Sequence, residues 1–335
     1  MTHTIETLPV LLIEAHSRCN CRCVMCDIWK TGEHREFTLA QLESQMDAIE
    51  RLRVRWVVFT GGEPLMHSNL FALADLLRGR GIRVSILSTG LLFERFAREI
   101  AEHLDDAIVS LDGPAGIHDR IRRVHGGFER ISQGVRAIHA HRPQFQIGAR
   151  CTVQKANHAA LVDSACAARR IGLSSISYLA ADLTSAAFHR AEPWSASRQS
   201  EIALTIGEIG VLERQIETLL NDSFVIDRPQ HLHRIVRHFR AHLGLEPFEA
   251  PRCNAPWVSA VMGMDGSVRP CFFHPPVGSA ASHSLDDALN AAPARAFRES
   301  LTISSNAVCQ RCVCSLYLTP QVLFPDVSGL SHIQV

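Results

Sequence analysis

The chain has 335 residues, equal numbers of acidic and basic side chains, and a formal net charge of zero. This balance excludes the long-range field that draws a protein to nucleic acid or to an anionic membrane. Hydrophobic residues make up 46% of the chain, enough for one large domain and a smaller one. The sequence has no signal-peptide pattern and no run of about 18 apolar residues, so we expect a cytoplasmic protein that binds neither nucleic acid nor a membrane.

Eleven cysteines stand out, because thiols stay reduced in the cytoplasm and grouped thiols there indicate metal ligands more than disulfides. Two of them, Cys151 and Cys166, are isolated, and we expect each to be a small buried apolar residue and not a ligand. The others form an N-terminal group and a C-terminal group: Cys19, Cys21, Cys23 and Cys26, and then Cys253, Cys271, Cys309, Cys312 and Cys314.

Residues 8–220 alternate short β-branched runs with amphipathic helical patterns. Strands are predicted at Val10–Glu14, Trp56–Thr60, Val84–Ser88, Ala107–Leu111, Phe145–Val153 and Ser174–Ala180. Helices are predicted between them at Thr38–Leu52, Asn69–Arg80, Leu91–His103, Phe128–His141 and Asn157–Ile171. Six βα units in series favour a parallel sheet with outer helices, curled into a partial (β/α)6 barrel with its reactive residues at the C-terminal strand ends.

The pattern changes after the sixth strand. One long helix is predicted over Ser195–Leu220 and a second over Gln230–Leu243. A hairpin follows, with strands at Val258–Met262 and Val268–Pro270 around a turn at Asp265–Gly266. We therefore expect a core domain over residues 1–225 and a small cysteine-rich α+β domain over residues 226–335.

Cys19, Cys23 and Cys26 form a C-x3-C-x2-C motif directly after the first predicted strand. Three thiolates on a tight loop can ligate three irons of a 4Fe–4S cube and leave the fourth iron open. A zinc loop completed by His16 or His34 is the alternative that the spacing leaves open. Cys21 lies between these ligands, and we expect it not to bind the metal.

Polar residues also follow the next strands. The turn Gly61-Gly62-Glu63 lets the backbone approach a ligand closely and offers a carboxylate for an ammonium group. Ser88 ends the third predicted strand. Ser110 opens the run Ser110-Leu111-Asp112-Gly113-Pro114, which His118, Asp119 and Arg122 follow. For Asp112 and His118, a substrate-facing role and a role within the loop both stay open, and Arg150 on the fifth strand is a candidate to reach the site.

Over Val10–Asn157 these motifs resemble the radical S-adenosylmethionine (SAM) superfamily. The resemblance implies that the open iron binds the amino and carboxylate groups of SAM. An electron supplied by a donor such as flavodoxin or ferredoxin then breaks a C–S bond, giving methionine and a 5′-deoxyadenosyl radical that removes a substrate hydrogen. It also implies that Gly61, Gly62 and Glu63 bind the amino group, that Ser88 or Thr89 binds the ribose, and that Ser110 binds the carboxylate. The chain departs from its relatives in having Gly90 where they often carry asparagine.

The C-terminal cysteines form two pairs, Cys253 with Cys271 and Cys309 with Cys312, which can surround one metal centre. A structural zinc knuckle fits this spacing as well. The pattern Cys253-x12-Gly266-x4-Cys271 resembles the start of SPASM and shorter twitch domains, which bind auxiliary 4Fe–4S clusters. Only Cys314 remains beyond the four, so we expect one auxiliary cluster on Cys253, Cys271, Cys309 and Cys312, with Cys314 in reserve.

Together these features predict a radical SAM oxidoreductase that oxidises, epimerises, decarboxylates or otherwise modifies a small molecule or a peptide. The first strand is predicted to begin near residue 9, so we expect no peptide-binding domain before the first cysteine motif, which favours a small molecule slightly. A non-catalytic, zinc-stabilised binding protein is the alternative. The sequence identifies neither a catalytic side chain nor the oligomeric state.

Overall fold

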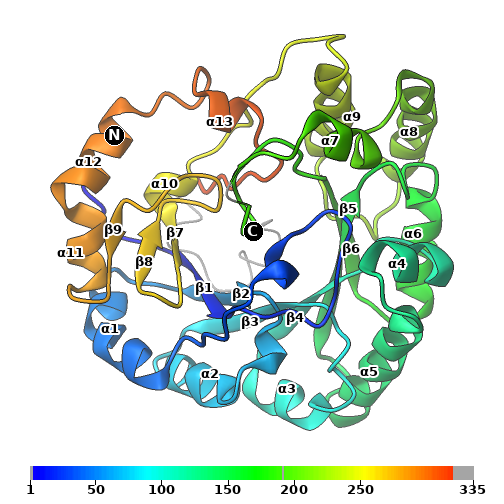
Figure 1. Ribbon diagram of the computed structural model, residues 1–335. Helices are drawn as coiled ribbons and strands as arrows, with labels where there is room; N and C mark the ends of the chain where they lie inside the picture. Colours follow the sequence, from blue (N-terminus) through cyan, green and yellow to red (C-terminus); the bar gives the residue numbers. More distant parts are fainter. Residues whose placement is uncertain (1–2, 191, 320–335) are drawn as a thin grey trace.

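The structure is a computed structural model that describes residues 3–190 and 192–319. Six parallel strands form a curved sheet with helices on its outer side (Figure 1). The predicted strands are confirmed, most within one residue at each end. They are β1 (Val10–His16), β2 (Trp56–Gly61), β3 (Arg83–Ser88), β4 (Asp106–Ser110), β5 (Gln146–Val153) and β6 (Ser175–Ala180).

The outer helices are α1 (Leu39–Arg51), α2 (Leu70–Arg78), α3 (Ala97–His103), α4 (Ala115–Arg122), α5 (Gly127–His141) and α6 (Leu161–Arg170). Helix α1 begins where Thr38 and Gln41 form a reciprocal capping box. Helix α3 is shorter than predicted because residues 91–96 form turns, and these turns carry Phe93 fully into the core. Two short 3-10 helices, η1 (Ile28–Lys30) and η2 (Pro64–Met66), follow the cysteine loop and β2.

The prediction of one helix over Ser195–Leu220 is wrong. The segment forms α7 (Ala196–Ile202) and α8 (Ile206–Leu219), with Ala203 extended between them. The Ile202 carbonyl accepts the N–H of Lys155, 2.8 Å away, and Thr205 caps α8 in a capping box with Glu208. Both Ile202 and Leu204 are buried, so the break lets two apolar side chains enter the core.

The remaining elements are α9 (Pro229–His242), α10 (Ala255–Val258), β7 (Ser259–Met262), β8 (Ser267–Arg269), β9 (Gly278–Ser279), α11 (Leu285–Asn290), α12 (Ala292–Ser300) and α13 (Ala307–Gln310). The predicted hairpin is confirmed as the antiparallel pair β7–β8. Strand β7 also pairs in parallel with β1, so the sheet runs β6-β5-β4-β3-β2-β1-β7-β8-β9. Strands on both sides of residue 225 therefore share one sheet, and the domain boundary stays a prediction.

Strands β1 and β2 are buried almost throughout, as parallel strands covered on both faces must be. Of the two isolated cysteines, Cys151 on β5 is buried, whereas Cys166 on α6 is exposed, so the expectation for Cys166 is wrong. The C-terminal ends of the barrel strands meet at one rim, where the loops after β1, β2, β3 and β4 come together. Within residues 3–190 and 192–319, none of the helices combines the length and hydrophobicity that crossing a bilayer requires.

Candidate iron–sulfur and cofactor site

The loop that carries Cys19, Cys21, Cys23 and Cys26 leaves the end of β1 and is bonded to neighbouring strand and helix ends. The N–H of Glu63 donates to the carbonyl of Arg18 at 2.9 Å. The N–H groups of Arg22 and Val24 donate to the carbonyls of Arg122 and Ile121, at 3.2 and 3.0 Å. The conformation of the loop is therefore fixed from the β2 turn on one side and from the end of α4 on the other.

The thiols of this loop differ in acidity. Hydrogen bonds with the sulfurs of Cys19 and Cys23, together with burial, raise the pKa of the Cys21 thiol. The hydrogen bond from Cys21, followed by the nearby charge of Arg122, lowers the pKa of Cys23 to about 6. Burial raises the pKa of Cys26 to about 12. This pattern favours Cys23 as a thiolate and Cys21 as a protonated neighbour, and thiolates are the ligands that iron–sulfur clusters require.

The two glycines after β2 are needed for a close approach to this loop. A Cβ atom on Gly62 would lie 2.1 Å from the carbonyl oxygen of Arg18, and one on Gly61 would lie 2.7 Å from that of His16. Gly61 also has a φ of 112°, in the region that favours glycine. Gly62 is thus packed against the start of the cysteine loop, and Gly61 against the end of β1. The N–H of Gly62 also donates to the carbonyl of His16 at 2.7 Å.

Glu63 is fully buried, and its carboxylate ties the β2 turn to the end of β3. It accepts the hydroxyl of Ser88 at 2.8 Å, the N–H of Thr89 at 2.7 Å and the N–H of Leu65 at 3.1 Å. Burial raises the pKa of Glu63, and the donors around it oppose that shift. The carboxylate therefore holds the turn at the end of β2 against the end of β3.

The strand ends of β4 and β5 lie beside each other at the same rim. Ser110, half-buried, pairs in register with Arg150. Asp112 is fully buried, and its carboxylate is bonded to neighbouring elements: it accepts the N–H of Thr152 on β5 at 2.9 Å and the Nε–H of Arg122 on α4 at 2.5 Å. The N–H of Asp112 donates to Nδ1 of His118 at 3.3 Å. Of the two roles left open for Asp112 and His118, the structure supports the one within the loop.

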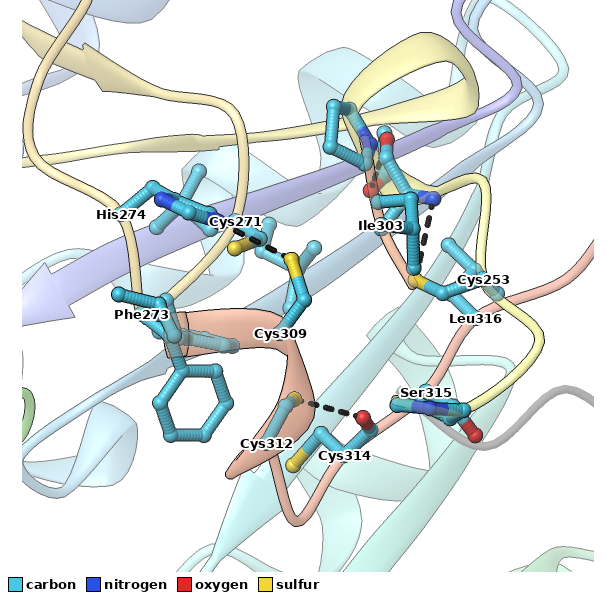
Figure 2. A pocket seen from close by; sticks show the side chains of 18 residues that line it. Cys253, Cys271, Phe273, His274, Ile303, Cys309, Cys312, Cys314, Ser315 and Leu316 are labelled. Carbon is cyan, nitrogen blue, oxygen red and sulfur yellow. Dashed lines mark hydrogen bonds between the residues drawn. The ribbon is translucent and has the colours of Figure 1, made fainter. Parts of the chain in front are cut away.

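A second cysteine site lies where α10, β7 and α13 meet. All five C-terminal cysteines line one largely apolar cavity there, with Cys271 and Cys309 adjacent and Cys312 beside Cys314 (Figure 2). His274 Nε2 lies 3.4 Å from the Cys309 sulfur. The Cys312 thiol donates to the carbonyl of Cys314 at 2.7 Å.

Burial controls the acidity of these thiols. It raises the pKa of Cys271 to about 12 and that of Cys309 to about 11. It also raises the pKa values of Cys312 and Cys314, opposed by the positive charge of Arg234. Buried thiolates in this cavity need a compensating positive charge, which bound metal ions supply as the thiols release their protons. Arg234 on α9 was not among the predicted site residues, and its guanidinium donates to the Cys312 carbonyl.

The spacing of the sulfurs bears on the zinc alternative. Tetrahedral zinc with Zn–S bonds near 2.3 Å needs sulfurs about 3.8 Å apart. Among the described residues, the set with three potential ligand atoms within 4.8 Å of one another is His16, His34 and Glu36, and it includes no cysteine. The two histidines proposed as a fourth zinc ligand both lie beside the Glu36 carboxylate. Nε2 of His16 is 3.7 Å and Nε2 of His34 is 3.6 Å from Oε1 of Glu36. In the part of the chain that the structure describes, neither cysteine set brings three ligand atoms within 4.8 Å of one another.

Comparison with known proteins agrees with this geometry. Residues 13–151 match the model of the radical SAM superfamily, and residues 253–313 match the SPASM model, an iron–sulfur cluster-binding domain. The chain is 31% identical over 160 residues to a pre-heme d1 synthase of Dinoroseobacter shibae. The matched region covers 46% of this chain and only 38% of that protein.

Solved structures show the same fold at low identity. SuiB of Streptococcus suis bound to the precursor peptide SuiA has a TM-score of 0.66 and 12% identity, covering 93% of this chain and 72% of that one. Native anSMEcpe with bound AdoMet has a TM-score of 0.63 and 17% identity, covering 90% and 86%.

The fold and the two cysteine sets define an iron–sulfur enzyme built on a partial (β/α) barrel. The chain carries a radical SAM domain over residues 13–151 and a SPASM domain over residues 253–313. Its cofactors are accordingly SAM, a 4Fe–4S cluster and an auxiliary cluster.

Proposed function

We propose that the chain cleaves SAM reductively and removes a hydrogen atom from a small molecule or a peptide. The bound 4Fe–4S cluster would supply the electron for this cleavage, and Cys19, Cys23 and Cys26 would hold it. The observation that carries the proposal is the position of the C-x3-C-x2-C loop, which leaves the end of β1 where β1 pairs with β2. The loop is also bonded to the glycine turn that the family uses for SAM.

The SAM site would be formed by Gly61, Gly62, Glu63, Ser88 and Ser110. The glycines bring the β2 turn against the cysteine loop, which places the turn's backbone groups beside the proposed cluster. Glu63 and Ser88 hold the ends of β2 and β3 together. Ser110 stands at the end of β4 on the same rim, where its hydroxyl can donate to a carboxylate.

A segment after β6 covers the cysteine loop. The indole N–H of Trp194 donates to Asp27 at 2.8 Å, and the Arg190 guanidinium lies over the Trp194 ring, 4.4 Å from its centre. Arg198 donates to the carbonyl of Val24 from α7. These contacts support a role in keeping water away from the cluster loop, which radical chemistry requires.

We further propose that Cys253, Cys271, Cys309 and Cys312 hold the auxiliary cluster. Four protein ligands leave no open iron, so the cluster would conduct electrons or support the fold without binding substrate. The peptide bound to SuiB supports a peptide substrate, and the resemblance to a pre-heme d1 synthase supports a small molecule. We expect a flavodoxin or ferredoxin as electron donor and a cytoplasmic location.

Anaerobic reconstitution tests the proposal. The chain should be brown, contain about eight irons, and release 5′-deoxyadenosine from SAM under reduction. Cys23→Ala should lose about four irons and that release, whereas the matched variant Cys21→Ala should keep both. A colourless, zinc-loaded preparation that leaves SAM intact would favour the zinc-stabilised binding protein instead.

A further inference from the structure

We propose that Arg122 raises the reduction potential of the N-terminal cluster, through its charge and a hydrogen bond to Cys23, and that Asp112 holds Arg122 in place. The inference rests on the proposed function, because it requires Cys23 to be a cluster ligand. It makes Arg122 a positioning and potential-setting residue that does not itself touch the substrate.

The contact with the ligand is direct and sealed from solvent. Arg122, the last residue of α4, places its Nη1 3.5 Å from the sulfur of Cys23. Arg122 is 8% exposed and Cys23 is 5% exposed. Water therefore does little to screen the guanidinium from the sulfur, and a charged donor makes the stronger kind of hydrogen bond.

A buried carboxylate anchors the guanidinium. Asp112 accepts the Arg122 Nε–H through one oxygen and the Thr152 N–H through the other. The carbonyl of Asp112 in turn accepts the Asn157 side-chain amide at 2.9 Å. Residues from the ends of β4 and β5 thus fix the position of one arginine, a level of support typical of groups around a metal centre.

The backbone of the same helix end bonds both neighbours of Cys23. The carbonyls of Ile121 and Arg122 are among the last four of α4, which find no partner within the helix. They accept the N–H groups of Val24 and Arg22. The side chain and the main chain around Cys23 are therefore both held by the end of α4.

The consequence for the cluster follows from charge. Reduction adds one negative charge to the cluster and its ligands, and a buried cation bonded to a ligand sulfur stabilises the reduced form. Removing that cation should lower the reduction potential. Removing the negative charge of Asp112 while the arginine stays should raise it, so the two changes have opposite signs.

The test is a redox titration of the anaerobically reconstituted chain, followed by electron paramagnetic resonance. The signal to follow is the one that added SAM alters, since the auxiliary cluster has no open iron. For Arg122→Met we expect a tenfold lower ratio of reduced to oxidised cluster at a fixed potential, a shift of about 59 mV for one electron. Asp112→Asn should shift the ratio the other way. Arg120→Met, an exposed arginine on the same helix, is the control and should match the wild type.

An unchanged potential in Arg122→Met, with the cluster present, would overturn the inference. Asp112→Asn keeps an oxygen that can accept the Arg122 Nε–H, so the arginine stays in place while the negative charge is lost. A fall in both Arg122→Met and Asp112→Asn would therefore overturn the inference too, because the charges of the two residues would not set the potential. If Arg122→Met does not assemble its cluster, Arg122→Lys and Asp112→Asn decide, with the lysine expected between methionine and wild type. A wild type without a SAM-sensitive signal would instead refute the proposed function.

Discussion

The carboxylate of Glu63 accepts the Ser88 hydroxyl at 2.8 Å, and no part of Glu63 is exposed. This bond joins the turn after β2 to the end of β3. The family resemblance assigns these two motifs to different parts of SAM, its amino group and its ribose. In this structure the two motifs form one buried unit, so a substitution in one motif should also alter the ligand binding of the other.

Ser88→Ala tests this unit. The substitution leaves one oxygen of a buried carboxylate without its hydroxyl donor and removes the acceptor of the Gly90 N–H. A lost hydrogen bond of this kind costs about 1 kcal/mol, so we expect SAM to bind about fivefold more weakly. Equilibrium dialysis of SAM against the reconstituted chain measures this. Ser200→Ala, at an exposed position, is the control; equal affinity in Ser88→Ala would show that the two motifs act separately.

Gly62→Ala should disrupt the cysteine loop. A Cβ there would meet the Arg18 carbonyl at 2.1 Å, so the backbone of the loop must move away from β2. We expect the reconstituted iron content to fall from about eight toward about four, because the N-terminal site loses its shape. Gly32→Ala is the matched control, since no atom lies within 4 Å of a Cβ at that position. Full iron content in Gly62→Ala would mean that the loop tolerates the shift.

The barrel was predictable because its signals are local. Each strand is a short β-branched run, and the motifs at the strand ends stand in the order that six βα units impose. The break between α7 and α8 is not local in this sense. It depends on the Lys155 N–H, which meets the Ile202 carbonyl only in the folded chain. The capping box at Thr205 and Glu208 was the available signal in the sequence.

The features of the site also fall into local ones, which the sequence predicted, and contacts formed only in the folded chain, which it did not. Cysteine spacing alone identified the two sets of thiols, because metal ligation constrains their separation. The contact of Arg122 with Cys23 spans 99 residues, and that of Arg234 with the Cys312 carbonyl spans 78. Spacing carries no information over such distances. The parallel pairing of β7 with β1 was unforeseen for the same reason.

The fifth cysteine of the auxiliary site leads to a paired prediction. Cys312 and Cys314 both line the cavity, but we assign only Cys312 as a ligand. Cys312→Ala should therefore lower the iron content from about eight to about four, and Cys314→Ala should leave it near eight. Iron and sulfide assays on anaerobically reconstituted protein measure both. The reverse result would show that Cys314 is the cluster ligand and that Cys312 is not.

His118 gives a prediction about pH. Burial lowers the pKa of His118 to about 4, against an ordinary value of 6.5. Between these values the unfolded chain binds a proton at this residue and the folded chain does not, so stability falls as the pH falls. The loss between pH 7.5 and pH 5.5 should be about 1.4 kcal/mol. His118→Gln keeps an acceptor for the Asp112 N–H and cannot titrate, so this part of the pH dependence should vanish. Anaerobic urea unfolding at the two pH values measures it, with exposed His125→Gln as the control. The same loss in His118→Gln as in the wild type would place the titrating group elsewhere.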